Sequence, residues 1–286
     1  MIYDVAIIGT GPAGISAALN LKIHEKNFIW IGSKNLSDKV TKAEQIRNYP
    51  GFSHVTGKEL NDAFKKQIED MNIEITEQMV NSIMSFGEHY AIMAGSEFYE
   101  AKTIILATGI ANIGTLPKEL DFVGKGVSYC ATCDGGLYRG KTISVICNNN
   151  RFEHEVEYLA NLAEKVYYFP QYKEVGIDLE NVEIMKDSVK AFAGEDRLEA
   201  AELRSGDALP VDGVFCLRDS VALATLLPDI ATEKGHIVVD RSMATNLKGV
   251  YAAGDCTGRP YQYTKAVGEG NVAAHSVIEY LGAFVN

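Results

Sequence analysis

The chain has 286 residues, 47% of them hydrophobic, so it can bury a sizeable core. Its net charge of −11 argues against nucleic acid as a partner, because binding phosphates requires a basic face. The apolar stretches fall short of the roughly 20 residues of a membrane span, and the N-terminus lacks the pattern of an export signal. We therefore expect a cytoplasmic protein.

Strands and helices alternate in the first part of the chain. The pattern predicts strands over residues 3–8, 28–31 and 103–107 and helices over residues 15–23 and 58–71. Trp30 falls within the second strand, where we expect it to be buried. This alternation is typical of an α/β fold built from strand–helix–strand units.

A second block begins near residue 113 and repeats this order. The pattern predicts strands over residues 142–146, 166–169, 236–239 and 250–253 and helices over 152–164 and after residue 270. Two similar blocks predict two Rossmann-like domains of the three-layer ββα type. We expect residues 1–112 and 241–286 to form a discontinuous first domain, with residues 113–240 as the inserted second domain.

A glycine-rich loop, Gly9-Thr10-Gly11-Pro12-Ala13-Gly14, joins the first strand to the first helix. Gly9 permits a tight turn, Gly11 lets the backbone approach a pyrophosphate, and Gly14 lets helix and strand pack closely. The free N–H groups at the start of the helix attract the anion. The loop predicts a dinucleotide site, and a turn without a ligand is the alternative.

The acidic residue that binds ribose hydroxyls in many such sites is absent from the end of the second strand. Gly32 and Ser33 stand there instead. Ser33 or Lys34 would therefore have to take over this role.

Cys130 and Cys133 form a C-x-x-C pair in a chain with five cysteines. Such a pair in a reducing compartment indicates a redox-active dithiol or half of a metal site. A structural zinc site needs four ligands, and Cys147, Cys216 and Cys256 do not form a second pair. The redox interpretation is favoured, and we expect no metal.

From Ser128 to Gly135 the sequence resembles the low-molecular-weight thioredoxin reductases, and most of all the ferredoxin-dependent flavin enzymes among them. Asn48 to Phe52, Ile105 to Gly109 and Asp240 to Cys256 match further family segments in the same order. The resemblance implies FAD as the cofactor, bound to the discontinuous first domain, and a homodimer. It also implies that the inserted domain carries the redox disulfide.

The resemblance assigns a role to individual residues. Cys130 and Cys133 would form the disulfide, with Cys133 nearer the flavin, and Asp134 would manage the thiol protons. Asp255 would bind the ribityl or phosphate region of FAD. The full set expected at the cofactor is Gly9, Gly11, Pro12, Ala13, Gly14, Ser33, Lys34, Asn48, Ala107, Thr108, Gly109, Gly254, Asp255, Gln262 and Tyr263.

The second nucleotide loop departs from the family pattern. Members that use NADPH carry a second glycine-rich loop where this chain has residues 147–152, Cys-Asn-Asn-Asn-Arg-Phe. A non-glycine residue in a left-handed conformation there would cost about 1–2 kcal/mol. Phe152 stands where helix and strand should approach closely, and Glu153 and Glu155 would repel a phosphate from the helix start. We expect this site to be occupied by side chains.

Two further segments of the expected NADPH site are altered as well. The His-Arg-Arg cluster that grips the 2′-phosphate is replaced by Phe169 to Lys173, which offers one lysine and no bidentate group. An apolar-Gly segment has become Cys216 to Ser220. Because three elements of one site are lost while the FAD motifs are kept, we expect a degenerate NADPH site.

The resulting hypothesis is electron transfer from reduced ferredoxin through FAD and the Cys130–Cys133 disulfide to thioredoxin, without NADPH. Lys34, Lys39 and Lys42 could dock an acidic ferredoxin, although a solvated loop has the same composition. The alternatives are a dithiol oxidase that uses oxygen, a divergent NADPH-dependent thioredoxin reductase, a protein with a second flavin, and a flavoprotein without catalysis.

Overall fold

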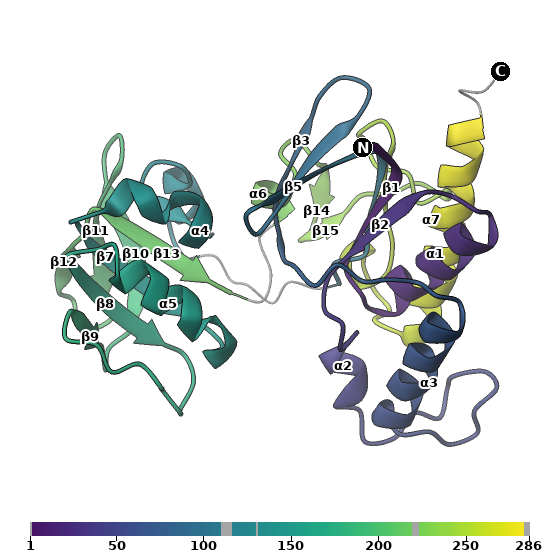
Figure 1. Cartoon of the computed structure of the whole chain (residues 1–286), viewed down its shortest axis with the longest axis horizontal. Coiled ribbons are helices and arrows are strands. Elements are labelled where there is room, and N and C mark those ends of the chain that lie inside the picture. The colour runs from purple at the N-terminus through teal and green to yellow at the C-terminus, as the bar shows by residue number, and fades with distance from the viewer. Residues whose placement is uncertain (1, 110–115, 130, 219–222, 283–286) are drawn as a thin grey trace. The chain divides into compact units, whose positions relative to one another are not determined.

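The computed structural model describes residues 2–109, 116–129, 131–218 and 223–282 (Figure 1). The chain divides into two compact units, residues 1–111 with 226–286 and residues 112–225. In this division the chain returns to the first unit at residue 226, whereas the sequence analysis placed that return at residue 241. The strands β14 (Thr232–Glu233) and β15 (His236–Ile237) belong to the first unit, because β15 packs against the turn η4 (Asp255–Thr257).

The first unit is built on one six-stranded sheet. Strands β2, β1, β5 and β16 are parallel, with β2 at one edge, and β4 and β3 continue the sheet as an antiparallel meander from the first half of β5. The bounds are β1 Ile2–Ile8, β2 Phe28–Ile31, β3 Val80–Ser85, β4 Tyr90–Ala94, β5 Glu97–Leu106 and β16 Val250–Ala252. Trp30 is fully buried, as expected.

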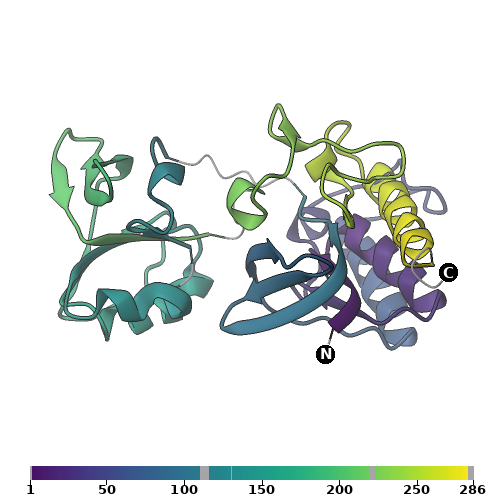
Figure 2. The same cartoon turned by 90° about the horizontal axis from the view of Figure 1, so that it is seen from above.

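The described part of this unit contains the α-helices α1 (Pro12–Ile23), α2 (Asp38–Thr41), α3 (Gly57–Asp70) and α7 (Tyr263–Gly282). Helices α1 and α7 pack side by side, as Figures 1 and 2 show in purple and yellow. Apolar side chains of α1, α3 and α7 share one core with β1, β5 and β16. Helix α3 begins at a capping box, in which Thr56 and Glu59 satisfy each other's backbone amides.

The second unit is built on the parallel sheet β6-β13-β7-β8-β9. Helix α5 (Glu153–Ala160) packs against this sheet (Figure 2), and the antiparallel sheet β10-β11-β12 contacts it through β11 and β13. This arrangement confirms the predicted class of two Rossmann-like α/β domains. The strand bounds are β6 Val127–Ser128, β7 Thr142–Cys147, β8 Lys165–Pro170, β9 Val182–Ile184, β10 Val189–Gly194, β11 Leu198–Leu203, β12 Ala208–Pro210 and β13 Gly213–Leu217.

Short helical segments complete the second unit and its border. They are η1 (Leu120–Phe122), α4 (Ala131–Asp134), η2 (Gly135–Tyr138), η3 (Asn150–Phe152) and α6 (Leu223–Leu226). Among the helices that the structure describes, none combines the length and apolar content needed to cross a bilayer.

The largest differences from the predicted helix boundaries lie at the start of α7 and at the end of α5. Helix α7 begins at Tyr263 and not after Gly270, because Gly270 lies inside the helix, where a Cβ would stand 2.1 Å from the Ala13 carbonyl oxygen. Helix α5 ends at Ala160 and not at Glu164, because Asn181 donates hydrogen bonds to the carbonyls of Ala160 (2.8 Å) and Ala163 (3.2 Å).

Candidate functional site

In the loop between β1 and α1, neighbouring backbone approaches Gly9 and Gly14 so closely that neither position has room for a side chain. Gly9 has φ +109°, and a Cβ there would stand 2.4 Å from the Ala107 carbonyl oxygen. A Cβ at Gly14 would stand 2.0 Å from the Gly9 oxygen, which also accepts a 2.9 Å hydrogen bond from Trp30 Nε1. Gly9 is therefore required by the close approach of the Ala107 backbone, and Gly14 by the packing of α1 against the end of β1.

Gly11 differs from its two neighbours in the motif. A Cβ at Gly11 would meet nothing within 4 Å, so the loop presents bare backbone at an open place. Gly11 is the N-cap of α1, Pro12 follows in the first turn, and that turn carries no acidic residue. The first N–H groups of α1 are thus available to an anion such as a pyrophosphate, and these residues fit a dinucleotide.

Beside this loop, the end of β2 positions Ser33 and Lys34. Gly32 has φ +157°, and a Cβ there would press on Thr10 Cγ2 at 2.8 Å. Ser33 Oγ accepts a 3.1 Å hydrogen bond from the Asn35 amide, and the Lys34 side chain is exposed. The Ser33 hydroxyl keeps its own proton to donate, as a ribose contact would require.

The strand end and turn that follow β5 and β16 lie next to the loop. Ala107 contacts Gly9 directly, with Thr108 and Gly109 following it, and Gly254 (φ +90°) would bring a Cβ to 3.0 Å from the Ala13 Cβ. Asp255 follows in η4 and is partly buried, and this burial raises the pKa of its carboxyl, whereas the Lys39 and Lys265 ammonium groups act to lower it. The expected FAD residues thus come together from three separate parts of the chain.

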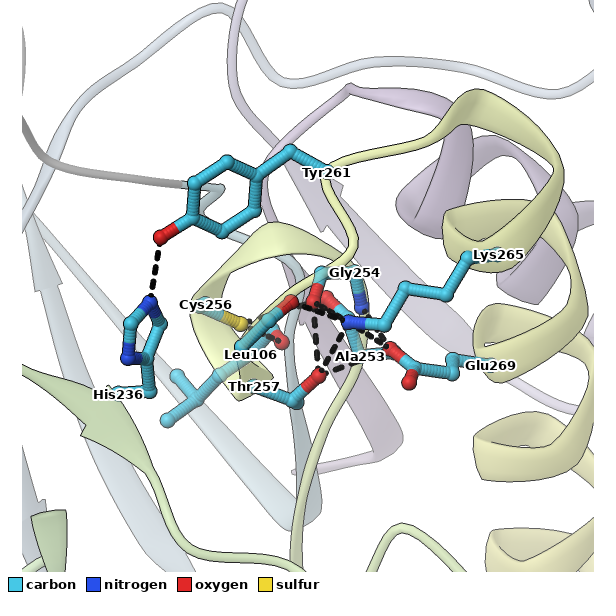
Figure 3. A network of polar contacts seen from close by, with 10 residues as sticks. Leu106, His236, Ala253, Gly254, Cys256, Thr257, Tyr261, Lys265 and Glu269 are labelled. Carbon is cyan, nitrogen blue, oxygen red and sulfur yellow. Dashed lines mark hydrogen bonds and ion pairs between the residues drawn. The ribbon is translucent and has the colours of Figure 1, made fainter. Parts of the chain in front are cut away.

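A polar network fixes the turn that carries Asp255 to the start of α7 (Figure 3). Lys265 Nζ donates hydrogen bonds to the Gly254 and Gly258 carbonyls, both at 2.8 Å, and forms a 3.0 Å ion pair with Glu269. The Gly254 amide in turn donates to Glu269 Oε2 at 2.8 Å. The backbone around Asp255 is held by charged groups that are largely buried.

The segment around residue 48 contacts the chain between η4 and α7. Asn48 Nδ2 donates a 2.7 Å hydrogen bond to Gln262 Oε1, and the Tyr263 hydroxyl donates to the Lys39 carbonyl at 3.4 Å. All fifteen residues expected at the cofactor belong to the first unit. Asn48, Gln262 and Tyr263 already bond within the protein, and the contacts of all fifteen residues with a cofactor stay a prediction.

The predicted redox motif belongs to the second unit, and its described part, Ala131–Asp134, forms α4. Cys130 lies outside the described residues, as does the side chain of Cys133. Ser128 Oγ donates a 2.7 Å hydrogen bond to Asp134 Oδ2. The Ala131 amide donates to the carboxylate of Glu155 on α5, and burial raises the pKa of that carboxyl. The backbone of the motif is therefore held by the helix behind it.

The loop after β7 follows a path without left-handed residues. No residue from Cys147 to Glu153 has a positive φ, and the loop closes as the turn η3, in which Asn149 Oδ1 accepts a 3.1 Å hydrogen bond from the Arg151 amide. The expected strain at these non-glycine residues was therefore wrong. Phe152 is buried in the core beneath α5. It takes the loop position that corresponds to Gly14 in the first unit, where the glycine allows α1 to approach its strand.

Side chains occupy the start of α5. Glu153 Oε1 accepts hydrogen bonds from the Tyr172 hydroxyl (2.8 Å) and the Gly176 amide (2.9 Å). The Tyr172 hydroxyl also contacts that of Tyr168, and the buried Cys147 thiol donates to the Asn149 carbonyl at 3.1 Å. Burial raises the pKa of both phenols, so they stay protonated. The first residue of α5 thus carries a carboxylate that is hydrogen bonded to Tyr172 and to the Gly176 amide.

Sequence reasoning missed three groups of residues. The contacts of Tyr172 with Glu153 and of Arg218 with Glu119 join distant segments, and no local signal announces them. Lys265 and Glu269 could have been found from their i,i+4 spacing on a predicted helix. Within the described ranges, no group of three or more His, Cys, Asp or Glu side chains is arranged to hold a metal ion.

Comparison with known proteins places the chain in a family. The family described as pyridine nucleotide-disulphide oxidoreductase matches residues 3–147 and 172–270, and the stretch between them contains η3, α5 and β8. Thioredoxin reductase of Listeria innocua is 30% identical over 305 residues, which cover 98% of this chain and 94% of that protein.

Solved structures give the same assignment. A ferredoxin-flavin thioredoxin reductase from Clostridium acetobutylicum is 47% identical with a TM-score of 0.89, covering 98% of both chains. A second crystal structure with this name and source is 43% identical with a TM-score of 0.92, covering 100% of both chains. The chain therefore belongs to the pyridine nucleotide-disulphide oxidoreductases as a thioredoxin reductase homologue, an oxidoreductase of a flavoprotein family whose cofactor is FAD.

Proposed function

We propose that this chain reduces thioredoxin with electrons from ferredoxin, without using NADPH. Two reduced ferredoxins would each give one electron, and the pair would reduce the Cys130–Cys133 disulfide to two thiols with the uptake of two protons. The thiols would then reduce the disulfide of thioredoxin by exchange. FAD, when bound, supplies the conversion between single electrons and an electron pair.

One observation carries this proposal: the first turn of α5 contains the acidic residue Glu153. A nicotinamide dinucleotide binds its pyrophosphate through free N–H groups at such a helix start. Here Glu153 already bonds Tyr172 and the Gly176 amide, and its negative charge would repel a phosphate. In α1 the corresponding turn has no acidic residue and an open face at Gly11. The chain would thus keep a nucleotide-binding loop before α1 and lack a usable one before α5.

Residues of the first unit would hold FAD. The α1 amides and Gly11 would bind the pyrophosphate, Ser33 or Lys34 the ribose, and Asp255 the ribityl or phosphate region. In the second unit Asp134, hydrogen bonded to Ser128, would take up and release the thiol protons.

The choice of ferredoxin as donor is supported by the 47% identity to an enzyme that bears ferredoxin in its name. Lys34, Lys39 and Lys42 are exposed on one segment of 34–42 that includes α2. The Tyr263 hydroxyl bonds the Lys39 carbonyl, so this segment lies beside the proposed flavin site. Its positive side chains would attract an acidic ferredoxin although the net charge is −11.

The test compares electron donors under anaerobic conditions. The FAD-loaded enzyme is mixed with NADPH, with NADH or with reduced ferredoxin, while flavin absorbance and the thiols of added thioredoxin are followed. We expect only ferredoxin to bleach the flavin and produce thiols. In a Cys133→Ser variant ferredoxin should still bleach the flavin, but thioredoxin should stay oxidised. Rapid bleaching by NADPH would refute the proposal.

A second experiment separates this proposal from the dithiol oxidase. The enzyme is given a small dithiol in air, and hydrogen peroxide is measured. Peroxide formed at a rate above that of thioredoxin reduction by ferredoxin would favour the oxidase and reject ferredoxin as the principal electron donor.

A further inference from the structure

A buried cluster of three polar side chains lies in the second unit, outside the residues assigned above. Glu119 is 0% exposed, and the Arg218 side chain 7%. Arg218 binds Glu119 through two hydrogen bonds, Nη1 to Oε1 at 2.8 Å and Nη2 to Oε2 at 3.0 Å. The buried hydroxyl of Tyr129 donates to Oε1 at 2.7 Å, and the Leu116 amide donates to Oε2 at 2.8 Å. The carboxylate therefore accepts four hydrogen bonds.

The three residues come from different places in the unit. Tyr129 follows β6 and Arg218 follows β13, and these strands are parallel neighbours, so both residues leave the same edge of the sheet. Glu119 precedes η1. Glu119 lies shortly after the first boundary between the units, and Arg218 shortly before the second. The ion pair thus ties the beginning of the second unit to its end.

A buried ion pair adds little net stability, because desolvation offsets most of the attraction between its charges. Packed apolar residues would hold these segments together as well. The pair instead fixes an orientation, because the planar guanidinium and the carboxylate fit each other in one geometry. The Tyr129 hydroxyl donates to the carboxylate held in this way. The position of Tyr129 is consequently set by Arg218 through Glu119.

Tyr129 directly precedes Cys130 in the redox motif. Ser128, on its other side, bonds Asp134, and Ala131 bonds Glu155. The described backbone around the motif is therefore anchored at three points, and Arg218 governs one of them. This arginine stands in a segment where NADPH-dependent relatives of this chain were expected to have glycine.

We propose that Arg218 is a positioning residue, which through Glu119 fixes Tyr129, the residue before Cys130, for electron transfer to the disulfide of the motif. The proposal rests on the assignment of Cys130 and Cys133 as the redox pair. It is independent of the electron donor. Arg218 itself touches no reacting atom.

The test uses the FAD-loaded enzyme and dithionite as the electron source, so that a failure of ferredoxin as donor does not affect the result. The variants are Arg218→Met, Arg218→Lys, the neutral pair Glu119→Gln/Arg218→Met, and Arg204→Met as the control, an exposed arginine of the same unit. Flavin bleaching is followed by absorbance. Cysteine thiols are trapped by rapid alkylation and counted by mass spectrometry.

We expect Arg218→Met to slow thiol formation about tenfold to a hundredfold relative to flavin bleaching, because small displacements of reacting groups cost this much. Arg218→Lys should recover part of the rate, and Arg204→Met all of it. The neutral double variant, in which no unpaired charge is buried, should regain the wild-type melting temperature but stay slow.

A purely structural role would give another result. If thiols form at the wild-type rate in Arg218→Met, or recover in the double variant together with the melting temperature, the proposal is wrong. If Arg218→Met does not fold, Tyr129→Phe decides, because it keeps the ion pair and removes only the link to the motif. Slower thiol formation and changed alkylation rates of the reduced cysteines in Tyr129→Phe would support the proposal, and wild-type values of both would reject it.

Discussion

Gly14 and Phe152 occupy corresponding places in the two strand–helix units of this chain, and they have opposite effects. Gly14 lets α1 approach so closely that a Cβ would stand 2.0 Å from the Gly9 oxygen. Phe152 fills that place with a buried ring, and Glu153 after it binds Tyr172. The size of the residue at this one position thus decides how closely the helix can approach its strand.

Three lone cysteines show how burial controls the chemistry of a residue. Burial raises the pKa of Cys216 to about 12 and that of Cys256 to about 11, and it also raises the pKa of Cys147. At neutral pH these groups are therefore thiols, which react slowly.

The raised pKa values predict loss of stability in alkali. Between pH 9, near the ordinary pKa of a thiol, and about pH 11, the unfolded chain releases protons that the folded chain retains. The free energy of unfolding should therefore fall with rising pH, by about 1.4 kcal/mol per pH unit for each thiol. Urea unfolding of the wild type and of Cys216→Ala, from pH 8 to 10.5, measures this slope. In the variant the free energy of unfolding should fall less steeply with pH, by about 1.4 kcal/mol per pH unit. Equal slopes would contradict the raised pKa of Cys216.

At the scale of elements, two helices of similar position differ in how their first turns are used. Helix α1 opens with Gly11 and Pro12 and has no acidic residue in its first turn, whereas α5 opens with Glu153 and Glu155.

Two ion pairs of i,i+4 spacing differ in how far they are exposed to solvent. Lys58 on α3 is 76% exposed and contributes little, whereas Lys265 on α7 is 18% exposed and bonds the backbone of a functional turn.

Two glycines of the loop before α1 should respond differently to an added methyl group. Gly14→Ala forces α1 away from β1, so we expect a lower melting temperature even in FAD-free protein, with a loss of about 1–3 kcal/mol. Gly11→Ala meets no protein atom and should cost about 1 kcal/mol at most. It should nevertheless weaken FAD binding about tenfold or more, because the methyl group stands where backbone would face the pyrophosphate.

Flavin content by absorbance and thermal unfolding of the FAD-free proteins check both outcomes. Wild-type FAD affinity in Gly11→Ala would show that the cofactor does not approach this face of the loop. An unchanged melting temperature in Gly14→Ala would contradict the tight contact between helix and strand.

At the scale of the whole molecule, charge distribution matters more than total charge. The chain carries −11, which would slow the approach of another acidic protein. Lys34, Lys39 and Lys42 place three positive side chains on one exposed segment of the first unit. Because salt screens charges beyond about 10 Å at moderate ionic strength, such a local group can dominate an encounter at short range.

Replacing Lys34, Lys39 and Lys42 together by Gln should slow flavin reduction by ferredoxin about tenfold at low salt. Reduction by dithionite should stay at the wild-type rate, and the difference should shrink as salt is added. The control replaces Lys22, Lys26 and Lys102 by Gln, which changes the net charge equally at other places of the same unit. Equal slowing in both triple variants would mean that net charge, and not this segment, guides ferredoxin.

Local signals in the chain were sufficient for the fold class and for the close contacts of the glycine loop, whereas the redox role of the Cys130–Cys133 pair stays a prediction. They depend on the spacing and steric size of neighbouring residues. For the same reason they misplaced the start of α7, because Gly270 resembles a helix start locally but serves a contact with Ala13. Strain was wrongly expected at residues 147–152, because the turn η3 offers another path without positive φ.

Packing between distant segments decided the rest. Glu153 and Tyr172 are 19 residues apart, Glu119 and Arg218 are 99 apart, and Asn48 and Gln262 are 214 apart. A hydrogen bond of this kind forms only after the fold has brought its partners together, and any one of many polar residues could have been the partner. Its identity is therefore a property of the folded chain, in which buried donors and acceptors must satisfy one another.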